Sequence, residues 1–552
     1  MLLHATATGS RSSSPRRGGF VIVAVLMVVT VLSLAAYQYS ALMDAEVLAA
    51  ERIRKTAEAR ALADSGVDVA MAYVADRSAF TGKLNSNPFD NQACFQNILV
   101  RDGSGPRAMG RFSVVSLDFG QDSANGSLPI KYGLNDEAGK ININALFLLD
   151  SSGKVLHDAL MKLPSMTDDI AWSIVTWIDP DPSNTSHPPG ANDEFYSSLH
   201  PPYKTKCAPL DTIEELLLVK GVTPSLLFGN DKNRNGKLDP GEDDGMGFTP
   251  GWAAYLTVYS REQNVDADGN PRINLNGNDL TTLQSQLIEL IGQDLTTFIL
   301  AYRLFGSSTS GAAGAKGANG AGGRTIQGTI ADLTTRVQQA IAKNQQARQR
   351  ISSLFSLVSA AISIQEQQQG GGGGGGGRPM GKGGNQPQQS QTVTMLFTSP
   401  LADKAQQVDL LGKLLDKTTT QNGTELPAKI NINTAPREVL LALPGLTEAA
   451  ADEIVAKRPQ WTGGDAPDSK YGTIAWLLED ASLPVATLQS LERYATARTQ
   501  VYRVQSIGYF DEAGPMARVE AVIDTNLGKP RIVYYRDLTD LGRSIDPRNL
   551  GR

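Results

Sequence analysis

The sequence predicts an α+β protein, and three observations carry that prediction. An uncharged apolar run from Phe20 to Met43 opens a long stretch of helical spacing. Side chains alternate with period two near residues 110–132 and again within 501–536, which indicates strands toward both ends of the chain. The middle of the chain is rich in helical spacing and capping residues. We therefore expect a long N-terminal helix, an antiparallel sheet, and a large, mainly helical domain between the sheet strands.

The apolar run is long enough to cross a membrane. Its 24 residues would span about 36 Å as a helix, against about 30 Å for a bilayer core. Arg11, Arg16 and Arg17 precede it and no acidic residue does, so the positive-inside rule places residues 1–19 in the cytoplasm. Helical spacing continues to about residue 75. The sequence thus predicts a single-pass membrane protein whose large domain lies on the side of the membrane away from the cytoplasm.

Composition excludes several function classes. The chain has 552 residues, a net charge of −6 and 54 glycines, so we expect two or three domains and no overall basic field for nucleic acid. Its four histidines have no metal-ligand spacing. The sequence contains no Ser-His-Asp pattern, nucleotide-binding loop or zinc motif, so we do not expect an enzyme.

The junction before the apolar run has an unusual form. Gly18 and Gly19 stand directly between the basic leader and Phe20, whereas a secretory signal places small residues after its apolar region. This arrangement resembles the class III leader of type IV pilins and pseudopilins. The resemblance implies that a prepilin peptidase cuts after Gly19 and methylates Phe20. The alternative is an ordinary membrane anchor that is never cut.

Ala24 departs from most pilin-like subunits in a specific way. It is the fifth residue after the expected cut, where most members of that family carry a glutamate. A carboxylate in lipid is costly unless it pairs with a neighbouring subunit. Within the family, absence of this glutamate is the mark of the K-type minor pseudopilin of type II secretion, which sits at the filament tip.

Three further stretches resemble the K-type pseudopilin. They are residues 136–144 (DEAGKININ), 214–223 (EELLLVKGVT) and 430–447 (ININ followed by a helix-hairpin-helix pattern). In the first stretch we expect a tight turn and a short strand. Ile141 and Ile143 would face inward, and Asn142 and Asn144 outward.

A calcium loop is predicted from Asp231 to Glu242. The spacing matches the EF-hand loop, with Gly236 at the sharp turn, although no flanking EF helices are evident. Its ligands would be Asp231, Asn233, Asn235, the carbonyl of Lys237, Asp239 and Glu242. Resemblance to the K-type pseudopilin supports structural calcium here. The alternative is a polar turn without an ion.

Cys94 and Cys207 are the two cysteines of the chain, and both lie on the predicted outer side. An oxidising compartment would allow a disulfide between them. The alternative is two unpaired thiols, because the sequence does not give their separation.

The resemblance implies a pilin-like fold with the long helix packed on the sheet. The helical insertion would carry helix-hairpin-helix or SAM-like elements. The expected parts are a leader (1–19), a transmembrane helix (20–43), the first part of the sheet (76–134), a helical domain with the calcium loop (135–304), a flexible Gly/Ala- and Gln/Gly-rich insert (305–395), a second helix-hairpin-helix region (396–498) and C-terminal strands (499–540). Within the insert, residues 331–362 could form one or two helices.

The expected function is that of a minor pseudopilin that caps the periplasmic pseudopilus and helps to start its assembly. Its implied partners are the I-type and J-type minor pseudopilins, the prepilin peptidase, the inner-membrane secretion platform and membrane lipid. The alternative is a membrane-anchored DNA-binding protein of the competence-receptor type. Against DNA, residues 429–458 hold four basic and four acidic side chains, whereas phosphate binding needs a positive surface.

Overall fold

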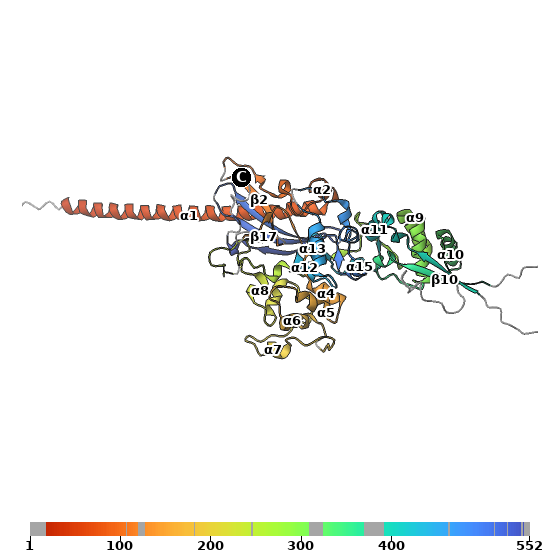
Figure 1. Cartoon of the computed structure of the whole chain (residues 1–552). Coiled ribbons are helices and arrows are strands. Elements are labelled where there is room, and N and C mark those ends of the chain that lie inside the picture. The colour runs from red at the N-terminus through yellow and green to blue at the C-terminus, as the bar shows by residue number, and fades with distance from the viewer. Residues whose placement is uncertain are drawn as a thin grey trace, which may run out of the picture.

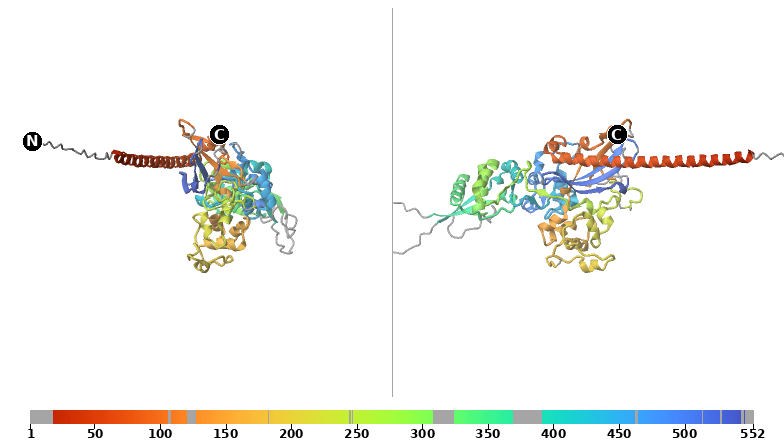
Figure 2. Two further views of the ribbon diagram at one scale, coloured as in Figure 1. Left: turned by 90° about the vertical axis from the view of Figure 1, so that its left-hand side faces the viewer. Right: turned by 180° about the vertical axis from the view of Figure 1, so that it is seen from behind.

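The computed structural model describes residues 18–545, apart from 106–107, 120–126, 182, 244, 246, 308–323, 369–390, 462–463, 513, 527 and 543–544. Figure 1 shows one long helix projecting from a broad head. The head has a sheet crossed by that helix, a helical body on the other side of the sheet, and a smaller body at the end away from the free half of the helix (Figures 1 and 2).

Helix α1 (Gly18–Ala75) runs without a break for 58 residues. Its first half is exposed along its whole length, as the apolar run predicts. Its second half packs on the sheet through Ala59, Leu62, Ala63, Val67 and Ala70, which are at most 6% exposed. Small residues at this spacing let the helix backbone approach the strands closely.

The main sheet has the antiparallel order β1-β2-β16-β17-β18, so its central strand comes from the far end of the sequence. Ser113 of β2 lies opposite Ile507 of β16, and Val504 of β16 lies opposite Ala521 of β17. The predicted completion of the sheet by C-terminal strands is therefore confirmed. The strands are β1 (Ile98–Arg101), β2 (Gly110–Leu117), β3 (Ile130–Lys131), β4 (Asn135–Asp136), β16 (Val501–Phe510), β17 (Ala517–Asp524) and β18 (Arg531–Asp537).

Gly508 marks the closest approach between α1 and the sheet. A Cβ at this position of β16 would collide with backbone atoms of Ala59 and Ala63 in α1.

Two short helices, α2 (Arg77–Gly82) and α3 (Gln92–Phe95), follow α1 and are capped by Asp76 and Asn91. Together with α1 and the sheet they enclose one of the two hydrophobic cores.

The first part of the insertion packs into the second core beneath the sheet. Thr167 caps the start of α6, and Thr212 forms a capping box with Glu215 at the start of a 3-10 helix. The elements are η1 (Glu137–Gly139), β5 (Ile141–Asn142), α4 (Ile143–Leu149), α5 (Lys154–Leu160), α6 (Asp168–Ile178), α7 (Asp193–Ser197), η2 (Ile213–Leu218), α8 (Pro224–Phe228), η3 (Trp252–Ala254), β6 (Leu256–Thr257), β7 (Glu262–Gln263) and β8 (Ile273–Asn274).

The middle of the 305–395 insert is folded: the helix expected within residues 331–362 is present as α10 (Ile330–Ala342), and the strands beside it were not predicted. A three-stranded sheet of order β10-β11-β9 lies beside two helices, and Phe355 and Phe397 are buried there. The two glycine-rich stretches, 308–323 and 369–390, lie outside the described residues. The elements are α9 (Leu280–Phe305), β9 (Arg324–Gln327), α10 (Ile330–Ala342), η4 (Leu354–Leu357), β10 (Ala361–Gln368), β11 (Gln391–Thr398) and η5 (Pro400–Ala402).

The second helical region joins the same core and leads back to the sheet. Gly445, with φ of 78°, forms the predicted turn between α12 and α13. The elements are α11 (Lys404–Lys417), β12 (Thr418–Thr419), β13 (Glu425–Leu426), β14 (Ile430–Asn431), α12 (Arg437–Leu441), α13 (Glu448–Lys457), η6 (Ser469–Gly472), α14 (Trp476–Glu479), α15 (Val485–Leu491), β15 (Ala495–Thr496) and, after the sheet, η7 (Thr539–Leu541).

Candidate functional site

The exposed half of α1 is the first candidate site. It is long and apolar enough to cross a membrane, with a mean hydropathy of 2.7 over its most apolar window and none of that window buried in the head. The predicted cleavage point, between Gly19 and Phe20, lies in the first turn of α1, and Phe20 is 81% exposed. Residues 1–17 of the predicted leader lie outside the described part of the chain.

Ala24 lies within this exposed apolar stretch. No acidic side chain stands in the first turn of α1, and none occurs between Phe20 and Met43. A helix of this composition offers lipid or a neighbouring helix mainly apolar contacts, apart from a few hydroxyl groups and the amide of Gln38.

The second candidate site is the junction cluster, which we define as Asp136, Glu137, Lys140, Arg503 and Glu520. Asp136 and Glu137 stand where the chain leaves the sheet for the insertion, whereas Arg503 and Glu520 lie on β16 and β17. Asp136 and Tyr502 are paired across β4 and β16, which brings the beginning and the end of the insertion together.

Asp136 joins two of the predicted motifs. Its Oδ2 accepts hydrogen bonds from Nδ2 of Asn431 at 2.8 Å, Oγ1 of Thr434 at 2.6 Å and Oγ1 of Thr499 at 2.7 Å. Its Oδ1 accepts from the backbone N–H of Ala138 at 2.7 Å. Burial raises the pKa of Asp136 to about 6, against the effect of these four donors. The stretches 136–144 and 430–434 therefore meet at a single carboxylate.

Glu137 is fully buried and carries the ionic part of the cluster. Nε of Arg503 donates to its Oε1 at 2.5 Å, and Nζ of Lys140 donates to the same oxygen at 3.2 Å. Nη1 of Arg503 also donates to Glu520 at 2.6 Å. Burial alone would raise the pKa of Glu137, but the charges of Arg503 and Lys140 outweigh it and lower the pKa to about 2. The carboxylate is thus ionised and paired at neutral pH.

The short strand after this cluster differs from its prediction. Ile141 and Ile143 are fully buried as expected, but Asn142 is also buried, at 6% exposure. Its Oδ1 caps α4 by accepting from the N–H of Ala145, and its Nδ2 donates to Ser260. The predicted outward face is wrong for Asn142 because β5 pairs with β6 inside the inserted domain, where both faces are covered.

The predicted calcium loop is closed by its own acidic residues. Asp231 accepts from the N–H groups of Asn235 at 3.1 Å and Gly236 at 2.7 Å. Glu242 accepts from the N–H groups of Lys232, Asn233 and Asp239, and Oδ2 of Asp239 accepts from the side chains of Asn233 and Asn235. Gly236 has φ of 76°, as the sharp turn requires.

The residues of this loop fit a calcium ion in chemistry. Oδ1 of Asn233 is buried and has no hydrogen-bond partner among the described atoms, which leaves an oxygen ligand to spare. The backbone N–H of Lys237 is held by Oδ1 of Asn235 at 2.7 Å. Within the described ranges, however, no three His, Cys, Asp or Glu side chains already gather as a metal centre. An ion would therefore have to draw the carboxylates of Asp231, Asp239 and Glu242 closer together.

Arg518 ties this loop to the sheet. It lies on β17, is 2% exposed, and donates to the carbonyl oxygens of Arg234 at 3.0 Å and Asn233 at 2.5 Å. Burial lowers the pKa of Arg518 to about 10. The backbone N–H of Leu128 also donates to the carbonyl of Gly236 at 2.7 Å. The loop therefore forms a second connection between the inserted domain and the sheet.

Sequence reasoning missed Arg503, Arg518 and Glu520. All three lie in strands that were recognised only by their alternating apolar residues. The charged residues themselves were the available signal. They lie on the face of β16 and β17 opposite α1, and if the inserted domain covers that face, each buried charge needs a partner.

Cys94 and Cys207 are unpaired, which is the second of the two alternatives that the sequence left open. Both are free and half-buried. Cys94 lies in α3 and its thiol donates to the carbonyl of Lys83, whereas Cys207 lies in the inserted domain, where its N–H donates to Trp177. Cys94 packs against the core formed with α1, whereas Cys207 bonds to α6 of the inserted domain, and this separation could not be read from the sequence.

The α12–α13 hairpin does not present a positive surface. Arg437 pairs with Asp452 at 2.6 Å, and Lys457 pairs with Glu453 at 3.1 Å. Nη1 of Arg458 donates to the carbonyl of Ala435, and burial lowers the pKa of Arg458. The cations of this hairpin are therefore engaged within the protein, which disfavours phosphate binding there.

Two segments of the chain match family models described as type II secretion system protein K. The matches cover residues 139–228 and 430–483. They begin within the two motifs that meet at Asp136, and they confirm the resemblance inferred from the sequence. No curated protein matches the chain.

One similar solved structure is a crystal structure of the GspK–GspI–GspJ complex of the type 2 secretion system from enterotoxigenic Escherichia coli. The matched chain has 11% sequence identity and a TM-score of 0.34, and the match covers 90% of this chain and 98% of that one.

Proposed function

Because residues 139–228 and 430–483 place the chain in the type II secretion system protein K family, we propose that it caps the tip of the pseudopilus as a minor pseudopilin and helps to start filament assembly. The observation that carries the tip position is α1. Its exposed half is apolar and has no carboxylate from Phe20 to Met43.

Two physical arguments support capping. A following subunit would find no acidic side chain on this helix with which its own charged N-terminus could pair in lipid. The head also spreads well beyond α1 on more than one side, so it blocks the space directly above the helix (Figures 1 and 2). A subunit of this shape accepts neighbours beside and below its helix but not above it.

The proposed partners are the I-type and J-type minor pseudopilins. Val47, Leu48 and Ile53 lie beyond the uncharged run and are 64%, 67% and 72% exposed. Apolar side chains at this height gain stability when a neighbouring helix covers them. We further propose an inner-membrane location with the head in the periplasm, contact with the secretion platform, and processing by prepilin peptidase.

We also propose a structural calcium ion in the Asp231–Glu242 loop. When bound, it would supply positive charge that holds the loop carboxylates together. The spare oxygen of Asn233 and the sharp turn at Gly236 within one continuous loop that holds Asp231, Asp239 and Glu242 support this proposal. Since Arg518 fixes the loop to β17, the ion would stiffen the attachment of the inserted domain to the sheet.

Site-specific cross-linking tests the tip function. In the full chain, with both native cysteines replaced by serine, Leu48→Cys should cross-link to I-type or J-type subunits in membranes. Leu148→Cys on α4 is the matched control, because it is also exposed, at 73%, but lies in the inserted domain. The proposal would be overturned if Leu48→Cys cross-linked to subunits both above and below it along the filament axis. Co-purification with DNA instead of pilin-like subunits would also overturn it.

A further inference from the structure

The smaller body of the head, at the end away from the free half of α1, contains α9, α10 and α11 (Figures 1 and 2). We call residues 280–417 the distal lobe. Their sequence has twelve lysine and arginine residues against seven aspartate and glutamate residues, a net charge of +5. Because the whole chain has a net charge of −6, the rest of it carries −11. Such an asymmetry in an acidic chain indicates that the lobe meets an anionic partner.

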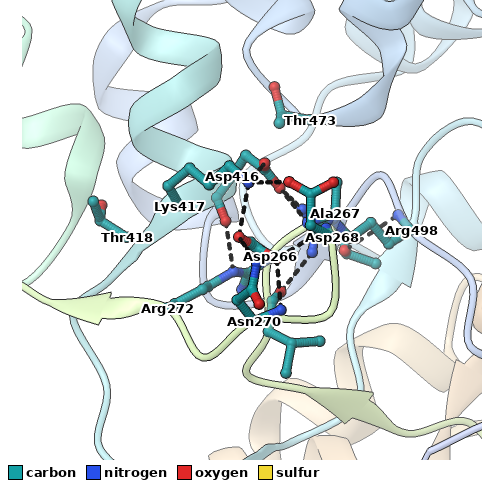
Figure 3. Close-up of polar contacts among 12 residues, drawn as sticks. Asp266, Ala267, Asp268, Asn270, Arg272, Asp416, Lys417, Thr418, Thr473 and Arg498 are labelled. Atoms are coloured by element: carbon teal, nitrogen blue, oxygen red, sulfur yellow. Dashed lines mark hydrogen bonds and ion pairs between the residues drawn. The ribbon is translucent and has the colours of Figure 1, made fainter. Parts of the chain in front are cut away.

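Two cations of the lobe are neutralised inside the protein. Figure 3 shows Lys417 beside the 266–270 loop, where its Nζ pairs with Asp266 at 2.7 Å. Arg336 of α10 pairs with Glu366 of β10 at 2.8 Å. These two cations therefore contribute little to the electrostatic field outside the lobe.

Three other cations lie on one short segment after α10, residues 343–350, which we call the cationic segment. Lys343, Arg348 and Arg350 are all exposed. None of them forms an ion pair with a residue that the structure describes, in contrast to Arg336 and Lys417. The segment itself contains no acidic residue. Its surface is therefore positive without compensation from its own side chains.

The cationic segment is held in place by Arg303 of α9. The backbone N–H groups of Arg348 and Gln349 donate to the carbonyl of Arg303 at 2.8 Å and 3.0 Å. In return, Nε of Arg303 donates to the carbonyl of Gln349 at 3.0 Å, and its Nη1 donates to the carbonyl of Gly277 at 3.1 Å. The backbone that carries the exposed arginines is thus fixed to a buried helix.

This anchor is itself a cation without a counter-ion. Arg303 is 2% exposed, and its hydrogen-bond partners are backbone carbonyls; no carboxylate among the described residues pairs with it. Burial, followed by the charge of Arg350, lowers the pKa of Arg303. Buried charges are normally paired. An anion held by Arg348 and Arg350 would therefore stabilise the anchor as well as the segment.

The side chains of the segment favour lipid phosphates over other polyanions. Apart from Ala347, residues 343–350 are lysine, arginine, asparagine and glutamine. A protein interface is built around an apolar or aromatic core, and single-stranded nucleic acid is bound by stacking on aromatic side chains. The segment offers neither. Cationic side chains are enough, however, to attract the headgroup layer of an anionic membrane.

We propose that the cationic segment binds the surface of a membrane that contains anionic phospholipid. Lys343, Arg348 and Arg350 would meet the phosphate oxygens of the headgroups. This membrane is not the one that α1 would cross, because the distal lobe lies at the opposite end of the molecule. The inference rests on the proposed function, in which a subunit at the filament tip carries the lobe toward the outer membrane.

The test uses the full chain reconstituted in nanodiscs of phosphatidylcholine, which enclose the apolar half of α1 and leave the head free. Immobilised nanodiscs should capture fluorescent vesicles that contain phosphatidylglycerol, and capture should weaken as sodium chloride is added. Vesicles of phosphatidylcholine alone, and nanodiscs without protein, should give no capture. Absence of capture, or equal capture of the uncharged vesicles, would overturn the proposal. Because no other pilin-like subunit is present, that failure would leave the tip function, which cross-linking tests, unaffected.

Competitors identify the anion. At equal ionic strength, sodium phosphate should release no more vesicles than sodium chloride does. Greater release by phosphate would indicate a site for the free anion. Release by micromolar single-stranded DNA would indicate a nucleic-acid site, and release by micromolar polyglutamate would indicate an acidic protein partner. Each of these three results would refute binding to a lipid surface.

Variants locate the binding. Arg348→Gln and Arg350→Gln together should lower the apparent affinity for the charged vesicles about thirtyfold, because each cation near an anionic surface contributes about fivefold. Replacement of both arginines by lysine keeps the charge and should retain most of the affinity. The matched control is the double change Lys162→Gln and Lys204→Gln, which removes the same charge at exposed positions of the inserted domain. An equal loss in this control would show diffuse attraction and refute the site.

A single change keeps the test decisive if the double arginine variant folds poorly. Lys343 is exposed in the turn that follows α10, and its backbone N–H alone is engaged, with the carbonyl of Gln339 at 3.1 Å. Lys343→Gln should therefore leave the fold intact and lower the affinity for charged vesicles about fivefold. An unchanged affinity would exclude the segment as the binding surface.

Discussion

Nε of Arg503 lies 2.5 Å from Oε1 of Glu137, although 366 positions separate the two residues in the sequence. Glu137 begins the inserted domain and Arg503 stands on the central strand of the sheet. Their ion pair is shielded from water and extends to Lys140 and Glu520. The head therefore depends on a buried charge cluster at the point where its two parts meet.

Loss of Arg503 should destabilise the head strongly. Arg503→Met leaves Glu137 buried with Lys140 as its remaining cation, and breaking a buried ion pair costs about 3–5 kcal/mol. Chemical denaturation of the full chain in detergent, followed by circular dichroism, measures the change. The double variant Glu137→Met and Arg503→Met should lose less unfolding free energy than the two single variants lose in sum. Additive losses would show that the two side chains do not interact.

Asp136 predicts a pH dependence with a definite sign. Burial raises its pKa from 3.8 to about 6, so its ionisation disfavours the folded state. Relative to Asp136→Asn, the wild-type head should therefore lose stability as the pH rises from about 4 to about 6, by up to about 3 kcal/mol, and show no further change above that. Denaturation midpoints of both proteins across this range provide the measurement. A difference that grows as the pH falls would contradict the prediction.

Gly508→Ala should loosen α1 from the sheet. The new methyl group would collide with the α1 backbone, which moves less easily than a side chain, and overpacking costs about 1–3 kcal/mol. Gly412→Ala is the control, because it lies within α11 and its Cβ would meet no atom closer than 3.9 Å. Limited proteolysis near residue 75 should increase for Gly508→Ala alone. Equal protection of both variants would argue against the close packing.

Calcium should raise the melting temperature of the full chain. Binding at a concentration of 100 times Kd would add about 2.7 kcal/mol to the stability. Asp239→Ala should abolish the shift, because it removes an oxygen donor from the loop. Asp243→Ala, just beyond the loop, should retain the calcium-induced shift in melting temperature. Magnesium should raise the melting temperature less than calcium does. If calcium leaves the wild-type melting temperature unchanged, the loop is a polar turn without an ion.

The mass of the membrane protein shows directly whether its leader has been removed. The membrane form should lack residues 1–19 and carry one methyl group on Phe20. Replacement of Gly19 by a bulky residue should leave the leader attached, whereas replacement of Ser12 should not. Intact-mass spectrometry of purified membranes distinguishes the two forms. A full-length mass for the wild-type protein would show an uncut anchor.

The sequence was sufficient where one local pattern determines one element. The apolar run predicted α1, and period-two alternation predicted β2, β16, β17 and β18. It failed where distant segments supply the environment. Asn142 is buried because β6 covers it, and the strands β9 and β10 were missed because their partner β11 lies beyond the second glycine-rich stretch.

The candidate sites follow the same division. The spacing from Asp231 to Glu242 was readable because the loop is continuous in sequence. Arg518, which anchors that loop, and Arg503, which pairs with Glu137, lie hundreds of residues away. No local sequence pattern identifies such a distant partner. The junction cluster could therefore be recognised only in the structure, where the two ends of the insertion lie together.

The position of β16 in the middle of the sheet also sets an order of events during biogenesis. Its neighbour β2 is synthesised nearly four hundred residues earlier and has no complete partner until β16 emerges. Contacts of such long sequence separation form late, because closing the intervening chain costs entropy. The growing chain therefore carries an unfinished sheet edge until its last strands are made, and these strands complete the module that its first helix began.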